Sequence, residues 1–300
     1  MKNSQPRARN RKIKERLIET GLLAAACSSV AVTFAIIFIL LKESLKFFAE
    51  VPLIDFLTDT QWTPLFDDAH FGIITLISGT VTTTLVALSV AVPLGLTIAI
   101  YISEFASPRL RETVKPILEI LGAVPTVVFG YFALVVVTPL LQKIYPDLPG
   151  FNMLSAGLVM GIMIVPYISS VSEDAMRAVP MHLREGAYAM GATRLRTALT
   201  VVVPAAFSGL AAALTLGCSR AVGETMVVAV AAGMQPNLTM NPLQPAATIS
   251  SFIVQVSLGD LPHDSIGYKT IFAAGLTLLL ITLVFNVIGF WLRQKFREEY

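Results

Sequence analysis

Two ionisable residues, Arg220 and Glu224, lie inside one of the longest apolar stretches of this 300-residue chain. A charge buried alone in a bilayer is costly, so ionisable groups at such depth face the protein interior or a water-filled path and usually find partners. The i,i+4 spacing puts both side chains on one helical face, where they can pair. A planar guanidinium also matches the oxygens of a tetrahedral oxyanion. The pair therefore predicts either contact with an anion in transit or a salt bridge that fixes the helix against a neighbouring subunit.

A second apolar run carries Pro125 and Thr126 between two glycines, Gly122 and Gly130. Proline lacks a backbone donor and interrupts a helix, and membrane proteins tolerate this where neighbouring groups satisfy the freed carbonyl. We therefore expect a bend or a gate at Pro125. The candidate residues of a substrate path are Arg220, Glu224, Thr225, Pro125 and Thr126.

The sequence predicts no catalytic residue, no cofactor-binding site and no metal site. The three histidines fall in separate segments, and the two cysteines, Cys27 and Cys218, fall inside apolar runs, so no metal site or disulfide framework is indicated. The phosphate-cradling pattern Gly-x-x-x-x-Gly-Lys-Ser/Thr does not occur either. We expect ATP hydrolysis, if it drives this protein, to take place on a partner, and we do not expect the chain itself to be an enzyme.

Membrane helices must position these residues, because 55% of the chain is apolar and only 14% is charged. Soluble domains carry about 25% charged residues. Runs of about 20 apolar residues can cross a hydrocarbon core of about 30 Å. We expect six such spans, near 21–41, 74–101, 116–141, 153–170, 201–232 and 270–291. The first run is too long for a cleaved signal peptide, whose apolar part has about 7–15 residues, so we expect an uncleaved helix.

The basic residues predict the orientation of these spans. Seven lie before the first span, three between the second and third, four between the fourth and fifth, and three after the sixth, so 17 of the 22 share one side. The other side has four lysines and several acids. The positive-inside rule then places both termini and the segment 171–200 in the cytoplasm. The net charge of +2 is modest, and we expect lipid but no nucleic acid as a partner.

The cytoplasmic segment 171–200 contains the signals of a short helix. Pro180 suits the first turn of a helix, Gly191 suits the left-handed position that ends one, and Thr193 can cap the next. Leu183 and Ala187 share one face by their spacing. Such a helix could dock against another protein, or it could lie on the membrane surface with its arginines at the lipid headgroups. On the external side, segment 246–256 could form a short helix that caps the path or receives a partner; a disordered loop is the alternative.

The sequence EGAYAMG over 185–191, followed by VVVP over 201–204, resembles the EAA loop of ABC import permeases, in which a short helix docks into a groove of an ATPase subunit. The glutamate, the glycine and the proline have the spacing of that pattern, while Gly186 replaces its first alanine. The resemblance implies an ATPase-docking loop formed by Leu183, Glu185, Ala187, Tyr188, Gly191 and Pro204.

Two further motifs resemble permeases of the high-affinity phosphate uptake system. They are GAVPTVVFG over 122–130 and GCSRAVGETM over 217–226. The Ser103-Glu104 pair, the long basic N-terminus and the sequence FGII over 71–74 are more similar to the C-type subunit, PstC, than to its A-type sister. The resemblance covers most of the membrane part of the chain, from about Gly72 to Trp291.

This resemblance implies an all-α protein of the bacterial cytoplasmic (inner) membrane with the type I ABC importer permease fold. The expected partners are an A-type sister permease that completes the anion pathway, two ATPase subunits that bind ATP and Mg, and a periplasmic phosphate-binding protein. The expected organisation is a basic cytoplasmic N-terminus (1–19), a first transmembrane helix with an external segment (20–71), a permease core (72–293) with its coupling loop (171–200), and a cytoplasmic C-terminus (294–300).

Three interpretations are open at this point. The first is ATP-driven phosphate import. The second keeps the same machinery but transports another oxyanion, such as molybdate, sulfate or phosphonate. The third is a secondary transporter or membrane enzyme without an ATPase, which predicts an internal repeat or a catalytic cluster of carboxylates or histidines; neither is found in the sequence.

Overall fold

The structure, a computed structural model, describes residues 5–66, 68–262 and 264–295, with side chains from Lys14 onward. The predicted terminal segments, 1–19 and 294–300, lie partly outside this range. The described residues form helices and one isolated β-bridge, between Trp62 and Phe71. The helices, with three π-helical segments named η, are α1 (Gln5–Glu50), α2 (Leu53–Thr58), α3 (Ile74–Ile100), η1 (Tyr101–Phe105), α4 (Pro108–Ala123), α5 (Thr126–Phe132), η2 (Ala133–Val137), α6 (Thr138–Gln142), α7 (Met153–Ala178), α8 (Met181–Ala189), α9 (Arg194–Thr197), η3 (Ala198–Val202), α10 (Val203–Ala205), α11 (Phe207–Val222), α12 (Met226–Ala231), α13 (Ile249–Ser257) and α14 (Ile266–Lys295).

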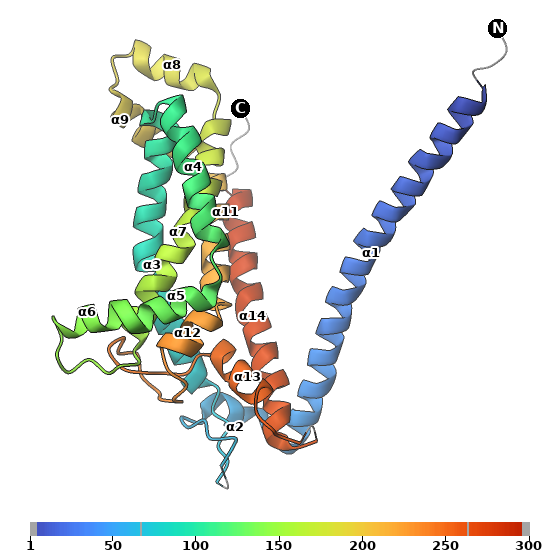
Figure 1. Cartoon of the computed structure of the whole chain (residues 1–300), viewed down its shortest axis with the longest axis vertical. Helices are drawn as coiled ribbons and strands as arrows, with labels where there is room; N and C mark the ends of the chain where they lie inside the picture. The colour runs from blue at the N-terminus through green and yellow to red at the C-terminus, as the bar shows by residue number, and fades with distance from the viewer. Residues whose placement is uncertain (1–4, 67, 263, 296–300) are drawn as a thin grey trace.

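Four of the predicted spans are single helical segments that are long and apolar enough to cross a membrane: α1, α3 with η1, α7 and α14. Two further crossings are formed by bent helix pairs, which brings the total to six if each pair is one span. Figure 1 shows the N-terminal end of α1, the C-terminal end of α14 and helix α8 at the same end of the molecule. An even number of crossings requires this arrangement, and the basic residues identify that end as the predicted cytoplasmic side.

The third predicted span, 116–141, is bent rather than continuous. Helix α4 ends at Ala123, and the helical segment from Thr126 to Gln142 turns away from it by 86°. Pro125 causes the break, because it cannot donate to the preceding turn and it forces Val124 into an extended conformation, with ψ 131°. The bend predicted at Pro125 is therefore confirmed, and α5 to α6 run across the bundle (Figure 1).

The predicted fifth span over 201–232 is interrupted twice. The segment Arg194–Ala205 meets α11 at an angle of 76°, and α11 ends at Val222, before α12 begins at Met226. Helices α4 and α11 have 16 residues each, which corresponds to about 24 Å, less than a hydrocarbon core of about 30 Å. The short helices that follow α4 and α11 therefore lie at membrane depth and need protein neighbours.

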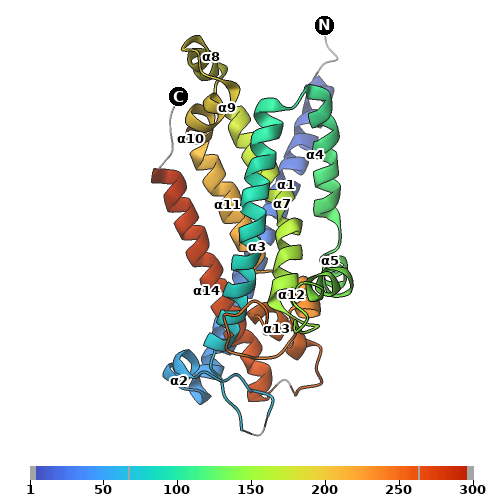
Figure 2. The ribbon, with the colours of Figure 1, turned by 90° about the vertical axis from the view of Figure 1, so that its left-hand side faces the viewer.

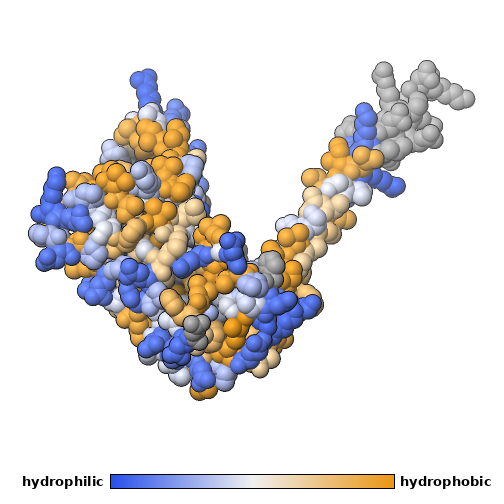
Figure 3. Space-filling model, turned by 60° about the horizontal axis from the view of Figure 1, so that its bottom comes forward, coloured by the Kyte–Doolittle hydropathy of each residue, from blue (hydrophilic) through white to orange (hydrophobic). Residues whose placement is uncertain are grey.

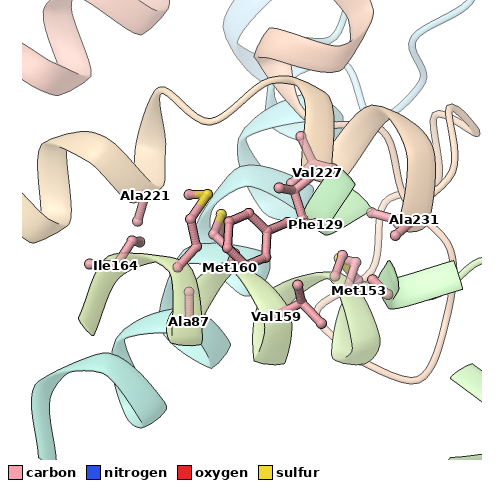
Figure 4. Packing of buried hydrophobic residues seen from close by; sticks show 14 of the residues in the cluster. Ala87, Phe129, Met153, Val159, Met160, Ile164, Ala221, Val227 and Ala231 are labelled. Carbon is pink, nitrogen blue, oxygen red and sulfur yellow. The ribbon is translucent and has the colours of Figure 1, made fainter. Parts of the chain in front are cut away.

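Helix α7 is the centre of the bundle. Two thirds of its most apolar stretch (67%) is buried, the largest share among the four long spans. Small residues let α3 approach closely: a Cβ atom on Gly157 would lie 2.6 Å from Cγ1 of Val86. In Figure 4, Met153, Met160 and Ile164 of α7 pack between α3, α5, α11 and α12. This cluster holds the two broken spans in place.

Helix α1 stands apart from the bundle and meets it through α14 near the external end (Figure 1). None of its most apolar stretch is buried within the chain, and side chains such as Leu22, Phe34 and Phe38 are exposed. The same apolar surface is visible along this arm in Figure 3. It suits contact with lipid or with another membrane subunit. On the external side, α13 shows that a short helix, rather than a disordered loop, forms over most of 246–256.

Candidate functional site

Helix α8 and the turn after it form the predicted cytoplasmic loop, beyond the end of the bundle (Figure 2). Pro180 precedes its first residue, and the helix ends in a Schellman motif: Gly191 donates to the carbonyl of Tyr188 (2.9 Å) and Ala192 donates to that of Ala187 (3.1 Å). The φ angle of Gly191 is +80°, as the sequence predicted. Thr193 then caps α9, which is also as predicted.

The outer face of α8 is open. Glu185, Tyr188 and Gly191 are exposed, and a Cβ atom on Gly186 would meet no atom within 4 Å. Leu183 behaves differently, because it packs inward against the cluster of Val179, Val202 and Leu210 that joins α8 to the elbow before α11. The remaining predicted docking residues are Ala187, which is half-buried, and Pro204, which is exposed in α10. Helix α8 thus has an open outer face with small residues, and its inner face packs against the bundle.

A buried ion pair fixes α8 to the end of the second span. The guanidinium of Arg184 donates to both carboxylate oxygens of Glu104 in η1, at 2.9 and 3.3 Å, and also to the backbone carbonyls of Val179 and Met176. Only 10% of the Arg184 side chain and 5% of the Glu104 side chain are exposed. Bidentate geometry with extra carbonyl partners is what a buried pair needs to offset its desolvation. Helix α8 is therefore tied directly to the ends of α3 and α7.

The same end of the bundle contains a second buried carboxylate, Glu173 of α7, which is 2% exposed. Arg111 and Lys115 of α4 approach it at 2.9 and 3.0 Å, and Arg177 lies at 3.8 Å. This cluster ties α4 to α7. In the sequence, Arg111 and Arg177 served only as topology signals, because nothing local showed that they surround an acid.

An open cleft of about 750 Å³ lies between η1 and α8. Its polar lining includes Ser103, Glu104, Arg111, Arg184, Tyr188 and Arg194. The cleft lies beside α8, and the ion pair between Arg184 and Glu104 forms part of its wall.

The predicted pair of Arg220 and Glu224 is not formed; no ion pair within 4.0 Å joins these two described residues. The physical reason is that α11 ends at Val222, so the i,i+4 geometry does not extend to Glu224. The Glu224 carboxylate turns to the start of α12 instead, where it accepts hydrogen bonds from the backbone N–H groups of Met226 (3.1 Å) and Val227 (3.3 Å). Glu224 is 8% exposed and acts as a helix cap.

Arg220 lies over the ring of Tyr167 from α7, with its Cζ atom 4.1 Å from the ring centroid. The Tyr167 hydroxyl donates to the carbonyl oxygen of Gly122 in α4 (3.0 Å). The buried Nε of Arg220 has no hydrogen-bond partner, and no carboxylate among the described residues lies within 4.0 Å of the guanidinium. A half-buried cation without an acid partner is chemically suited to meet an anion. Tyr167 was not predicted from the sequence, where its only signal is a polar group next to Pro166 inside an apolar run.

The other path candidates lie at the breaks of the two bent spans. Pro125 is exposed and precedes α5, while Thr126 is its first residue; Thr225 precedes α12 and donates to the carbonyl of Gly223. Helices α5 and α12 pack against each other, and a Cβ atom on Gly130 would lie 3.0 Å from the carbonyl oxygen of Met226. Figures 1 and 2 show the two short helices side by side. The structure therefore brings the two breaks together.

A family model described as "Binding-protein-dependent transport system inner membrane component" matches residues 91–298. The probable ABC transporter permease protein YqgH of Bacillus subtilis is 35% identical over 285 residues, covering 94% of this chain and 91% of that protein. The phosphate transport system permease protein PstC of Haemophilus influenzae is 36% identical over 230 residues (70% and 71%), and PstC of Xylella fastidiosa is 32% identical over 256 residues (79% and 77%).

Solved structures share the fold at lower identity. A chain of a bacterial ABC transporter that imports the acidic polysaccharide alginate superposes with a TM-score of 0.63 at 19% identity, covering 96% of this chain and all of that one. A chain of the MetNI methionine ABC transporter, in an inward-facing conformation, gives a TM-score of 0.55 at 20% identity, covering 76% and 95%. At these identities the likeness concerns the fold alone.

Proposed function

Because the chain belongs to the family of binding-protein-dependent transport system inner membrane components, we propose that it is the C-type permease subunit of an ATP-driven phosphate importer. Family membership makes the chain a multi-pass inner-membrane permease of an ABC importer, and ATP is bound and hydrolysed on separate ATPase subunits. It therefore excludes the secondary transporter and the membrane enzyme considered from the sequence. The importer complex also includes a periplasmic binding protein.

The observation that carries the anion part of the proposal is the environment of Arg220. Its guanidinium lies within the fifth span, lacks a carboxylate partner among the described residues and keeps a buried donor without an acceptor. A tetrahedral oxyanion supplies acceptors in the geometry that a planar guanidinium prefers. The PstC relatives, at 32–36% identity, favour phosphate as the oxyanion.

In this proposal Glu224 does not pair with Arg220 but has a structural role. Its carboxylate holds the start of α12, and the Ser250 hydroxyl, near the start of α13, donates to its backbone carbonyl (2.6 Å). We propose that Glu224 fixes the short helix that, with α5, borders the path next to Pro125, Thr126 and Thr225. A sister permease of the A type completes the path on the side that this chain leaves open.

The coupling part of the proposal uses α8. Glu185, Ala187, Tyr188 and Gly191 form the face that docks into an ATPase subunit, and Leu183 and Pro204 support it from behind. ATP binding on the two ATPase subunits moves α8, and the ion pair between Arg184 and Glu104 transmits that movement to α3. The core assigned to this machinery is 72–293, with the coupling loop at 171–200. A phosphate-binding protein docks at the opposite end, near α2 and α13.

The test is phosphate uptake by the reconstituted complex of both permeases, the ATPase and the binding protein in proteoliposomes. Labelled phosphate should accumulate with ATP, and an excess of sulfate, molybdate or a phosphonate should compete weakly. Arg220→Gln should reduce uptake strongly, and Arg220→Lys, which keeps the charge but loses the planar, bidentate guanidinium, should reduce it less. Strong competition by another oxyanion would replace phosphate by that solute, and normal uptake by Arg220→Gln would end the proposed role of Arg220.

A further inference from the structure

Three elements meet around the side chain of Tyr167. Its ring, on α7, lies under the guanidinium of Arg220 from α11, and its hydroxyl reaches the Gly122 carbonyl at the end of α4. One aromatic residue therefore connects the candidate anion contact with the helix end that precedes the break at Pro125.

The contact between Arg220 and the Tyr167 ring has a clear physical basis. A guanidinium over an aromatic face is attracted by the ring quadrupole, and the attraction grows when water is excluded. An aromatic ring brings no carboxylate to the guanidinium, so the N–H groups that do not face the ring remain available to oxygen acceptors. The ring thus holds the cation in the membrane without neutralising it, whereas a carboxylate partner would compete with an incoming anion.

The hydroxyl of Tyr167 donates a hydrogen bond to a carbonyl that the bend leaves without its helical partner. In a continuous helix, the carbonyl of Gly122 would accept a hydrogen bond from the residue four positions later, but α4 stops at Ala123. The tyrosine hydroxyl takes the place of that donor at 3.0 Å. Phenylalanine would keep the stack on Arg220 and lose this bond, so the two functions of the side chain can be separated by mutation.

Tyr167 lines a cavity. A mainly apolar cavity of about 360 Å³ lies between α4 and α7 and is lined by Gly122, Ala123, Pro166, Tyr167, Ser169 and Ser170, among others. The ring of Tyr167 therefore has open space beside it, between α7 and α4.

We propose that Tyr167 is a positioning residue for transport: its ring holds Arg220 ready for the anion, and its hydroxyl ties that state to the bent end of α4. The inference rests on the proposed role of Arg220. An anion that draws the guanidinium away from the ring weakens this contact. Because the same tyrosine is bonded to the end of α4, anion binding at Arg220 then affects the helix break beside Pro125.

The experiment compares Tyr167→Phe, Tyr167→Leu, Arg220→Gln and the double variant Tyr167→Leu with Arg220→Gln in the complete reconstituted complex. The initial rate of phosphate uptake, the stimulation of ATP hydrolysis by the loaded binding protein, and the yield of assembled complex are measured together. Tyr145→Leu is the matched control, because Tyr145 is an exposed tyrosine outside this contact.

We expect Tyr167→Leu to reduce uptake about tenfold, which lies between the values typical of exposed and of desolvated cation–π contacts. Tyr167→Phe should reduce uptake less, and the control should leave it unchanged. In the Arg220→Gln background, Tyr167→Leu should add no further loss to the residual uptake and ATPase coupling, since its effect passes through Arg220. If Tyr167→Leu lowers the complex yield, uptake is normalised to the amount of assembled complex, and Tyr167→Phe tests the hydroxyl bond alone.

Normal uptake by Tyr167→Leu would overturn the inference, and so would independent, multiplicative losses in the double variant. These outcomes are distinct from failure of the proposed function. If Arg220→Gln transports phosphate normally, the anion role of Arg220 is wrong; if Arg220→Gln is inactive while both Tyr167 variants are normal, only the positioning role of Tyr167 is wrong.

Discussion

The guanidinium of Arg184 forms two hydrogen bonds with the carboxylate of Glu104, and both side chains are almost completely buried. These residues lie 80 positions apart in the sequence. The contact joins the helix that we propose for ATPase docking to the end of the second span. It gives the importer a rigid connection from the docking surface to the membrane bundle.

Breaking this pair should uncouple the complex. Glu104→Gln leaves the Arg184 charge buried without its partner, a change that typically costs about 3–5 kcal/mol. We expect a lower melting temperature and loss of ATPase stimulation by the loaded binding protein. Replacing both residues, Glu104→Gln with Arg184→Gln, should recover part of the stability without recovering full coupling. Glu112→Gln, at an exposed position of α4, is the control and should change neither quantity. Normal ATPase stimulation in Glu104→Gln would show that the ion pair between Arg184 and Glu104 is not needed for coupling.

Gly191→Leu should impair docking through the backbone alone. A Cβ atom at this position would meet nothing within 4 Å, so the penalty comes from the φ of +80°, which costs an L-residue about 1–2 kcal/mol. We expect normal membrane insertion, weaker ATPase association and loss of uptake. Gly186→Ala is the matched control: it is also open to solvent but has an ordinary helical backbone, and it should transport normally. Normal uptake by Gly191→Leu would mean that this turn is not needed for docking.

Glu224 and Arg220 should behave as independent sites. Because Glu224 caps α12 and forms no ion pair with Arg220, Glu224→Ala should destabilise the complex by about 1 kcal/mol through loss of the cap. The double change Arg220→Gln with Glu224→Gln should not restore uptake over Arg220→Gln alone. Uptake and complex yield are measured for the two single variants and the double. Recovery of both in the double variant would indicate a functional pair that forms in another state of the transporter.

The topology can be tested with reporter fusions. Fusions at Arg16, Arg194 and Lys295 should read as cytoplasmic, and fusions near Asp59 and Gly259 should read as external, because the basic residues gather at one end of the bundle. A reporter that combines phosphatase and galactosidase readouts checks both outcomes in one strain. A periplasmic signal at Arg194 would overturn both the orientation and the docking role of α8.

The external segment should loosen as the pH rises. A hydrogen bond from His70 Nδ1 to Asp59 (2.8 Å) raises the pKa of His70, helped by the charges of Asp59 and Asp68. Burial alone would raise the pKa of Asp59, but the hydrogen bonds from Gln61 and His70 outweigh it, and the pKa of Asp59 is lowered. The raised His70 pKa stabilises the fold fully below the unfolded value of about 6.5, and this contribution is lost as the pH passes the folded pKa. The protection factors of residues 59–71, which are corrected for the base-catalysed intrinsic rate of amide exchange, should therefore be lower at pH 8.5 than at pH 6, and His70→Gln should remove the difference.

Much of the fold follows from the sequence because membrane insertion is governed by local composition. The apolar runs predicted the positions of α1, α3, α7 and α14, and the local chemistry of Pro180, Gly191 and Thr193 predicted the limits of α8 and α9. Each of these features depends on residues close in the chain, whose backbone preferences do not need a distant partner. The bend at Pro125 belongs to the same group, although its angle of 86° does not follow from the proline alone.

The partners of the charged residues were decided only by the tertiary structure. The i,i+4 spacing suggested that Arg220 pairs with Glu224, but the helix ends at Val222, and Arg220 stacks on Tyr167 from another helix. Glu104 and Arg184, and Glu173 with its basic neighbours, likewise meet across elements far apart in the chain. The sequence determined which residues must lie in the membrane and which must leave it, since that depends on each segment's transfer energy. Only the packing of α4, α7 and α11 decided which buried charge meets which partner, because helix ends and crossing positions depend on contacts between segments.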